Sequence, residues 1–309
     1  MSIKAAWELA KEAFSSWLDD YGQSMGAALA YYTVFSMAPL LLIVISVAGL
    51  IFGADAARGE ILGQLRGLMG QDAALAIQGL LESVNKPAES TLATAIGLTV
   101  LLVGATSVFA ELQDVLDRIW RAPIRGKPSG VWALLRSRFL SFGMILGIGF
   151  LLIVSLVFSA ALTALQSWWE PWFGGWAILA MVVNQVIAFA MTTAAFAMIY
   201  KIMPRVHIQW PDVWVGAAVT ALLFTLGKYL IGLYIGKSGV TSSFGAAGSL
   251  VVVLVWVYYS AQIFLIGAEF TWVYAHTFGS RKGKKRPGRL AELAAEVGAP
   301  PPSSSSSTT

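Results

Sequence analysis

Hydrophobic residues form six long runs along the chain, separated by shorter polar segments. Each run is long enough to cross a membrane, since about 20 predominantly apolar residues cross the roughly 30 Å hydrocarbon core of a bilayer. The runs lie near residues 25–52, 92–112, 139–165, 177–200, 213–236 and 248–275. The pattern predicts an all-α polytopic membrane domain over residues 22–276, with six transmembrane helices.

The segments between and beyond these runs have patterns of their own. Residues 1–21 place apolar residues, two of them Trp, at spacings of three and four, so we expect an amphipathic helix in the membrane interface. Residues 54–90 predict a hairpin of two short helices, broken at Gly70, that caps the outer face of the bundle; a moving lid over a cavity is the alternative. Residues 277–309 start with a basic cluster and end in Pro and Ser, which predicts a disordered cytoplasmic tail.

Composition and charge agree with this map and give it an orientation. The chain is 57% hydrophobic and 12% charged, whereas ordinary globular domains have about 25% charged residues. Sixteen of the 21 Lys and Arg residues fall on the inner side if the N-terminus is cytoplasmic, and cytoplasmic loops carry such an excess. We therefore expect both termini in the cytoplasm, with anionic lipid head groups as partners at that face and no nucleic-acid partner.

Residue types that serve catalysis and metal binding are scarce. The chain has no Cys, and its two His residues, His207 and His276, lie in different segments without metal-ligand spacing. The stretch GLYIGKS at residues 232–238 is one residue shorter than the phosphate-loop pattern, and its glycines suit close helix packing instead. We expect no cofactor, no metal site and no enzymatic activity.

Polar side chains inside the apolar runs are the candidate functional residues. An ionisable side chain in hydrocarbon costs about 2.5 kcal/mol or more on insertion scales, so it usually faces a partner or a water-filled cavity. Pro39 interrupts the first predicted span and is expected to kink it. The predicted polar path comprises Tyr31, Tyr32, Ser36, Pro39, Glu111, Asn184, Gln185, Tyr259, Gln262 and Glu269.

Each of these residues also has a purely structural interpretation. Pro39 can simply bend the helix, and Glu269 can make a structural hydrogen bond to a neighbouring helix. Glu111, Asp114 and Asp117 recur at three-residue intervals, which also suits a solvated helix end with local ion pairs.

Four stretches, in this order and spacing, resemble the YihY/virulence factor BrkB family of bacterial inner-membrane proteins. They are AALAYYTVFSMAPLLL, FAELQDVLDRIW, YKIMPRVHIQWPDVWVGAAVTALLF and FGAAGSLVVVLVWVYYSAQIFLIGAEF. The resemblance covers roughly residues 10–276. Phe244, where Tyr-Gly is common, and Asp117, where Asn is common, depart from the pattern.

The resemblance implies a multi-pass protein of the bacterial inner membrane. Members have been labelled ribonuclease BN, but this sequence has neither a soluble catalytic domain nor a metal-ligand constellation, so we expect no ribonuclease activity. We expect a transporter or lipid translocase with an unidentified solute or lipid substrate. The alternative is a membrane scaffold or envelope-organising protein that transports nothing.

Overall fold

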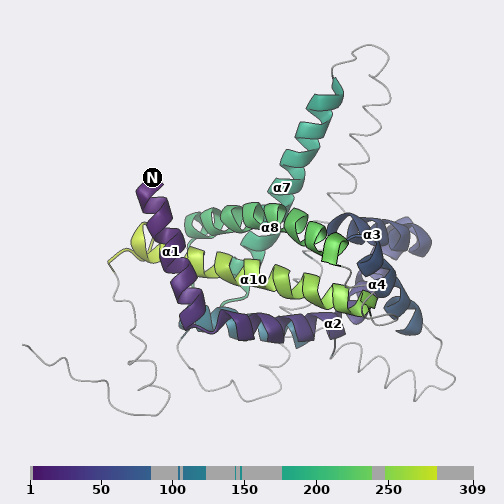
Figure 1. Cartoon of the computed structure of the whole chain (residues 1–309), viewed down its shortest axis with the longest axis horizontal. Helices are drawn as coiled ribbons and strands as arrows, with labels where there is room; N and C mark the ends of the chain where they lie inside the picture. The colour runs from purple at the N-terminus through teal and green to yellow at the C-terminus, as the bar shows by residue number, and fades with distance from the viewer. Residues whose placement is uncertain are drawn as a thin grey trace, which may run out of the picture.

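The computed structural model describes residues 3–84, 104, 107–122, 143, 147, 176–238 and 248–283. In this part of the chain all regular elements are helices, labelled as in Figure 1. They are α1 (Ile3–Asp19), α2 (Gly22–Phe52), α3 (Ala54–Met69), α4 (Gln71–Val84), α7 (Trp176–Ile202), α8 (Trp210–Ser238) and α10 (Gly248–Thr277). Residues 107–119 are also helical.

Among the described residues, four helices are long and apolar enough to cross a membrane. The apolar stretches are Gly22–Leu50, Val182–Ile202, Trp210–Ile235 and Leu250–Thr277. They correspond to the first, fourth, fifth and sixth predicted spans, so these four predictions of helix are confirmed. The second and third predicted spans, near 92–112 and 139–165, lie mostly outside the described residues, and the count of six stays a prediction.

Two glycines set the ends of helices around the predicted hairpin. Gly53, at φ 87°, separates α2 from α3, and Gly70, also at φ 87°, separates α3 from α4. Residues with a Cβ rarely adopt this conformation, whereas glycine does so without steric cost. Two short helices broken at Gly70 are therefore present as predicted. Pro39 lies inside α2, which continues past it to Phe52.

Helices α2, α8 and α10 run side by side, and α10 packs against both of the others (Figure 1). Helix α1 packs on α10 at one end of this group, and the α3–α4 hairpin lies at the opposite end. Helix α7 packs on α8, and its N-terminal part extends away from the other helices. We refer to the two ends of the group as the α1 end and the hairpin end.

The interface between α8 and α10 is built from two complementary pairs of Gly and Thr. A Cβ on Gly216 would lie 1.8 Å from the hydroxyl oxygen of Thr271, and one on Gly267 would lie 2.0 Å from that of Thr220. Each Thr hydroxyl donates to its own helix, Thr220 to the Gly216 carbonyl and Thr271 to the Gly267 carbonyl. The missing side chains let the two backbones approach closely without an unsatisfied hydroxyl.

The N-terminal segment is helical, as α1, and its contacts with the protein include only part of the predicted apolar set, to which Trp17 belongs and Leu9 and Ala13 do not. Leu9, Ala13 and Trp17 are buried in the core at the α1 end. Trp7 and Phe14, from the apolar set that the three- and four-residue spacing indicates, are 69% and 50% exposed. A location in the membrane interface, which this exposed set would suit, stays a prediction.

Candidate functional site: a buried charged junction

Several elements converge at the α1 end of the bundle. The turn at residues 20–21 joins α1 to α2, residues 120–121 follow the helical segment 107–119, and the last third of α10 packs beside them. We call the polar and aromatic side chains at this point the junction site. It consists of Trp17, Asp20, Arg121, Gln262, Glu269 and Trp272.

The backbone at the junction site is unusual in two places. Tyr21 has φ 59° and Arg121 has φ 49°, and these are the non-glycine residues with positive φ in the described part of the chain. This conformation is uncommon for a residue with a Cβ. It costs about 1–3 kcal/mol and tends to occur where the surrounding structure enforces it, often at functional sites. Tyr21 directly follows Asp20 in the turn, and Arg121 carries the positive charge of the junction site.

Gln262 of α10 ties α1 to α2. Its side-chain oxygen accepts a hydrogen bond from the indole N–H of Trp17 at 3.1 Å, and its amide nitrogen donates to the Gln23 carbonyl at 3.4 Å. Gly26 provides the room, because a Cβ there would lie 2.1 Å from the Gln262 nitrogen. Gly22 does the same for the Trp17 ring. The first turns of α2 therefore fit closely around these two side chains.

Asp20 and Arg121 form an ion pair with an N–O distance of 3.5 Å. Their side chains are only 13% and 14% exposed, so solvent screens the pair weakly. The Arg121 guanidinium also lies 4.9 Å from the centroid of the Trp272 ring, within the range of a cation–π interaction. The pair joins the α1–α2 turn to the segment that follows residues 107–119.

Glu269 lies beside this pair and is fully buried. Both of its carboxyl oxygens are enclosed, no N–H or hydroxyl group of the described residues donates to them, and the Asp20 carboxyl is close enough for a hydrogen bond. The charges that act on it are those of Asp20, Arg121 and Asp19. Arg121 already pairs with Asp20, so no cation of the junction site is left to balance an ionised Glu269. A buried carboxylate whose charge is not balanced is strongly disfavoured.

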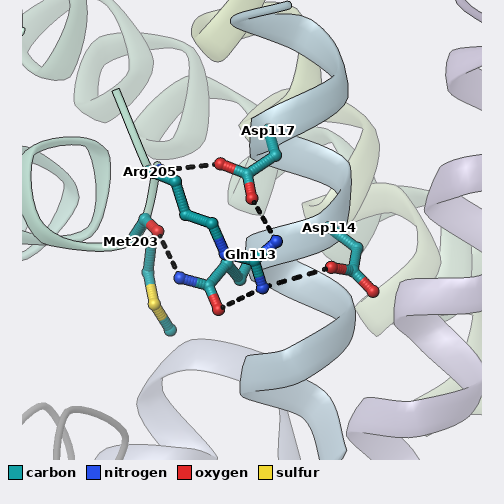
Figure 2. A network of polar contacts seen from close by, with 5 residues as sticks. All are labelled: Gln113, Asp114, Asp117, Met203 and Arg205. Atoms are coloured by element: carbon teal, nitrogen blue, oxygen red, sulfur yellow. Dashed lines mark hydrogen bonds and ion pairs between the residues drawn. The ribbon is translucent and has the colours of Figure 1, made fainter. Parts of the chain in front are cut away.

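A second polar network lies nearby and has a different character (Figure 2). Figure 2 shows the Arg205 side chain between Gln113 and two carboxylates of the helical segment 107–119. The guanidinium lies 3.1 Å from Asp117 and 3.9 Å from Asp114, and it donates to Gln113 at 3.2 Å. Gln113 donates in turn to the Met203 carbonyl at 2.9 Å. We call these five residues the Arg205 network.

Asp117 accepts a 2.7 Å hydrogen bond from the backbone N–H of Arg205. Burial raises the pKa of Asp117 above its ordinary value; the hydrogen bond and the charge of Arg205 oppose this rise, and the charge of Asp114 adds to it. The ion pairs here join residues about 90 positions apart. They are not the pairs within one helix end that the sequence suggested for Asp117 as the structural alternative.

Ser36 and Pro39, the centre of the predicted polar path in α2, face another segment of the chain. The Ser36 hydroxyl donates to the Gly104 carbonyl at 2.5 Å and lies 2.9 Å from the Ser107 hydroxyl. A Cβ on Gly104 would lie 3.3 Å from the Pro39 ring. These two residues therefore form a helix contact, and Ser36 is fully buried in it.

The remaining residues of the predicted path lie on three separate elements, α2, α7 and the helical segment 107–119. Tyr31 and Tyr32 are 57% and 37% exposed on α2, and the side chains of Asn184 and Gln185 are exposed on α7. Glu111 is partly buried near the α1 end. Whether these positions border a transport path stays a prediction.

Tyr259, also in the predicted path, lines an open apolar groove of about 380 Å³ between α8 and α10. The groove is lined by Leu230, Ile231, Tyr234, Val255, Tyr258 and Tyr259.

Sequence reasoning identified Gln262 and Glu269 but missed the other members of the junction site. Asp20 appeared as one of several charges in an amphipathic helix, and Arg121 appeared as part of the basic inner loop. Their pairing joins positions 101 apart in the sequence, which no local spacing indicates.

Long apolar helices with buried polar junctions at their ends define a polytopic α-helical membrane protein. The chain belongs to the virulence factor BrkB family, whose model matches residues 13–291. No solved structure matches the chain.

Curated relatives carry the name UPF0761 membrane protein. The one from Tolumonas auensis is 26% identical over 82% of each chain. The one from Psychrobacter is 25% identical, and the alignment covers 83% of this chain and 46% of that protein. The one from Azotobacter vinelandii is 27% identical over 89% of this chain and 64% of that protein. The chain thus spans only part of the longer relatives.

Proposed function

We propose that the protein is a transporter of the bacterial inner membrane, and that it translocates a lipid. The single observation that carries this proposal is Glu269, a fully buried acid inside a helix long enough to cross a membrane, to which no N–H or hydroxyl group of the described residues donates. Ionisable residues at such positions are rare and usually mark pathways for substrates, ions or protons. A purely structural acid would be expected to have its hydrogen bonds satisfied.

The location of the other polar residues favours a lipid over a soluble substrate. Tyr31, Tyr32 and the Asn184–Gln185 pair are exposed on helices long and apolar enough to cross a membrane. A lipid translocase needs polar side chains at a surface that lipid covers, because the head group crosses while the acyl chains stay in the bilayer. The open apolar groove between α8 and α10 suits an acyl chain.

The proposal includes six spans with both termini in the cytoplasm. Helix α1 packs against α10, so the two ends of the described chain lie at the same end of the bundle. The same end holds Arg118, Arg121 and Arg281, as the positive-inside rule requires of a cytoplasmic face. Anionic lipid head groups are the proposed partners there.

Lipid translocation can be measured without knowing the natural substrate. The purified protein is reconstituted into phosphatidylethanolamine and phosphatidylglycerol liposomes that contain a phospholipid with a fluorescent head group. Dithionite then quenches only the outer-leaflet label unless the protein exchanges lipid between leaflets. We expect quenching beyond the outer leaflet with the wild type, and slower exchange with Glu269→Gln. The matched control is Glu82→Gln, an exposed acid of the hairpin.

Wild-type liposomes in which the inner-leaflet label stays protected would contradict the proposal. So would equal exchange by Glu269→Gln and the wild type at equal protein density.

A membrane scaffold is the second candidate, and a different observation favours it. Trp7 and Phe14 of α1 are exposed although they are large and apolar, which suits attachment of α1 to a membrane surface or to another protein. This function predicts that a variant with both residues replaced by Ser no longer complements a strain that lacks the protein, whereas Glu269→Gln complements it as well as the wild type does.

We propose no enzymatic activity. Purified protein that cleaved RNA in the presence of divalent metal ions, and lost the activity on substitution of its own residues, would overturn this.

A further inference from the structure

Glu269 differs from the other carboxyl groups in the described part of the chain, because both of its oxygens are enclosed and no N–H or hydroxyl group of the described residues donates to either. It is fully buried on the side of α10 that faces the α1–α2 turn. Gln262 and Trp272, seven residues before and three after it, contact the same region. The acid is therefore aimed into a closed, polar contact between elements.

The charges around Glu269 do not balance if it is ionised. Asp20 and Asp19 act on it from α1 and its turn, and Arg121 acts on it from the segment after residues 107–119. Arg121 is already paired with Asp20 at 3.5 Å. His276, two turns further along α10, has its Nδ1 at 2.8 Å from the Trp272 carbonyl. An ionised Glu269 thus adds a second carboxylate beside a guanidinium that one carboxylate already engages.

We propose that Glu269 is a proton-binding site, and that the bound proton holds the α1–α2 turn against α10. A protonated Glu269 is neutral and has an O–H that can donate to the Asp20 carboxylate. The Asp20–Arg121 pair then remains balanced in its buried position. A metal cation fits the site less well, because the described residues hold no group of three or more His, Cys, Asp or Glu that could bind one.

Loss of the proton places two like charges next to each other where the side chains are largely shielded from solvent. Like charges at this distance repel, and burial strengthens the repulsion. Separation of the α1–α2 turn from α10 relieves it, because Asp20 belongs to the turn and Glu269 to the helix. The proton therefore controls the docking of α1, whatever the protein moves, and this goes beyond the proposed lipid translocation.

Infrared difference spectroscopy tests the proton directly on the purified full chain in lipid nanodiscs. We expect the wild type to show the C=O stretch of a buried carboxylic acid at neutral pH, and this band to disappear at high pH. The band should be absent in Glu269→Gln and unchanged in Glu82→Gln. A wild type without this band at neutral pH, or a band that survives in Glu269→Gln, would overturn the proposal. So would a band that sodium ions abolish at constant pH, since a cation would then be the ligand.

A second variant keeps the test valid if Glu269→Gln does not fold. Asp20→Asn removes the neighbouring negative charge and frees Arg121 to interact with Glu269. We expect the midpoint at which the band is lost to move to lower pH in Asp20→Asn. A midpoint that does not move would contradict the proposed contact between Glu269 and Asp20.

The docking of α1 can be followed with single cysteines, because the chain has none of its own. Ala13 is 1% exposed against the core at the α1 end, whereas the neighbouring Ser15 is exposed. We expect the ratio of maleimide labelling at Ala13→Cys to that at Ser15→Cys to rise at high pH in the wild-type background. It should stay low in the Glu269→Gln background, which cannot acquire the charge. A ratio with the same pH dependence in both backgrounds would refute control of α1 by this proton.

Discussion

The junction site and the Arg205 network contain the same charged groups in different surroundings. Each has one arginine and two carboxyl groups: Arg121 with Asp20 and Glu269, and Arg205 with Asp117 and Asp114. The side chains of Arg205 and Asp114 are 56% and 68% exposed, and that of Asp117 is 11% exposed. Those of the junction's ion pair are 13% and 14% exposed, and Glu269 is fully buried.

The comparison shows that burial, rather than composition, distinguishes a candidate site from a surface network. In the Arg205 network, water can solvate the charge that the arginine does not balance, as is usual for exposed pairs of modest energy. At the junction site the three side chains are largely shielded from solvent, so the second acid must stay neutral or disturb the packing. The three predictions that follow sharpen or break this difference, from the largest expected effect to the smallest.

Removing the arginine should have unequal consequences at the two sites. Arg121→Met leaves Asp20 buried without its partner, and breaking a buried pair in this way costs about 3–5 kcal/mol. Arg205→Met removes an arginine that is 56% exposed and whose partners, Asp114 and Asp117, are 68% and 11% exposed, so a smaller loss is expected than at the junction site. Chemical denaturation of both variants in the same detergent, followed by tryptophan fluorescence, gives the two free energies of unfolding. Equal losses would show that the junction pair is not buried in the functional state.

Adding a methyl group should distinguish the tightly packed junction from the open hairpin. Gly26→Ala places a Cβ 2.1 Å from Gln262, and overpacking of this kind costs about 1–3 kcal/mol. Gly63→Ala, inside α3, has no atom within 4 Å and should stabilise the helix by about 0.4–1 kcal/mol.

Thermal unfolding midpoints measure both glycine variants. A neutral Gly26→Ala would mean that Gln262 moves aside freely, and thus that its bonds to Trp17 and Gln23 are weak.

The pH dependence of the Arg205 network gives the smallest effect. Because the pKa of Asp117 is raised in the folded protein, the fold binds its proton more tightly than the unfolded chain does. The resulting stabilisation is present below the ordinary pKa of about 3.9 and is lost as the pH rises through the folded value. Stability of the wild type relative to Asp117→Asn should therefore fall as the pH rises through this window. A rise over the same window would mean that Arg205 dominates and lowers the pKa of Asp117 instead.

The sequence predicted the helices well because their signal is local. The fourth to sixth predicted spans begin and end within three residues of α7, α8 and α10. The break at Gly70 was likewise readable, since Gly-Gln-Asp interrupts two apolar periodicities. Length and apolar character decide such elements, and both can be read from a window of about 20 residues.

The junction site was only half predictable, for a physical reason. Glu269 and Gln262 attract notice because a polar residue in an apolar run is costly and needs an explanation. Asp20 and Arg121 lie in polar segments, where charge is ordinary, and only the packing of α1 against α10 brings them beside Glu269. Ser36 is another noticeable polar residue, and its hydroxyl donates to the Gly104 carbonyl; its place on a polar path stays a prediction.

We infer that the buried junction site governs lipid translocation, and that the more exposed Arg205 network, which has the same charged groups, does not. The most direct test compares Asp20→Asn with Asp117→Asn, since each removes one carboxylate from an arginine, in the dithionite assay of reconstituted protein at equal density. We predict that Asp20→Asn slows lipid exchange by about tenfold or more, which corresponds to about 1.4 kcal/mol, whereas Asp117→Asn stays close to the wild type. Equal slowing by both variants, or none by either, would contradict the account.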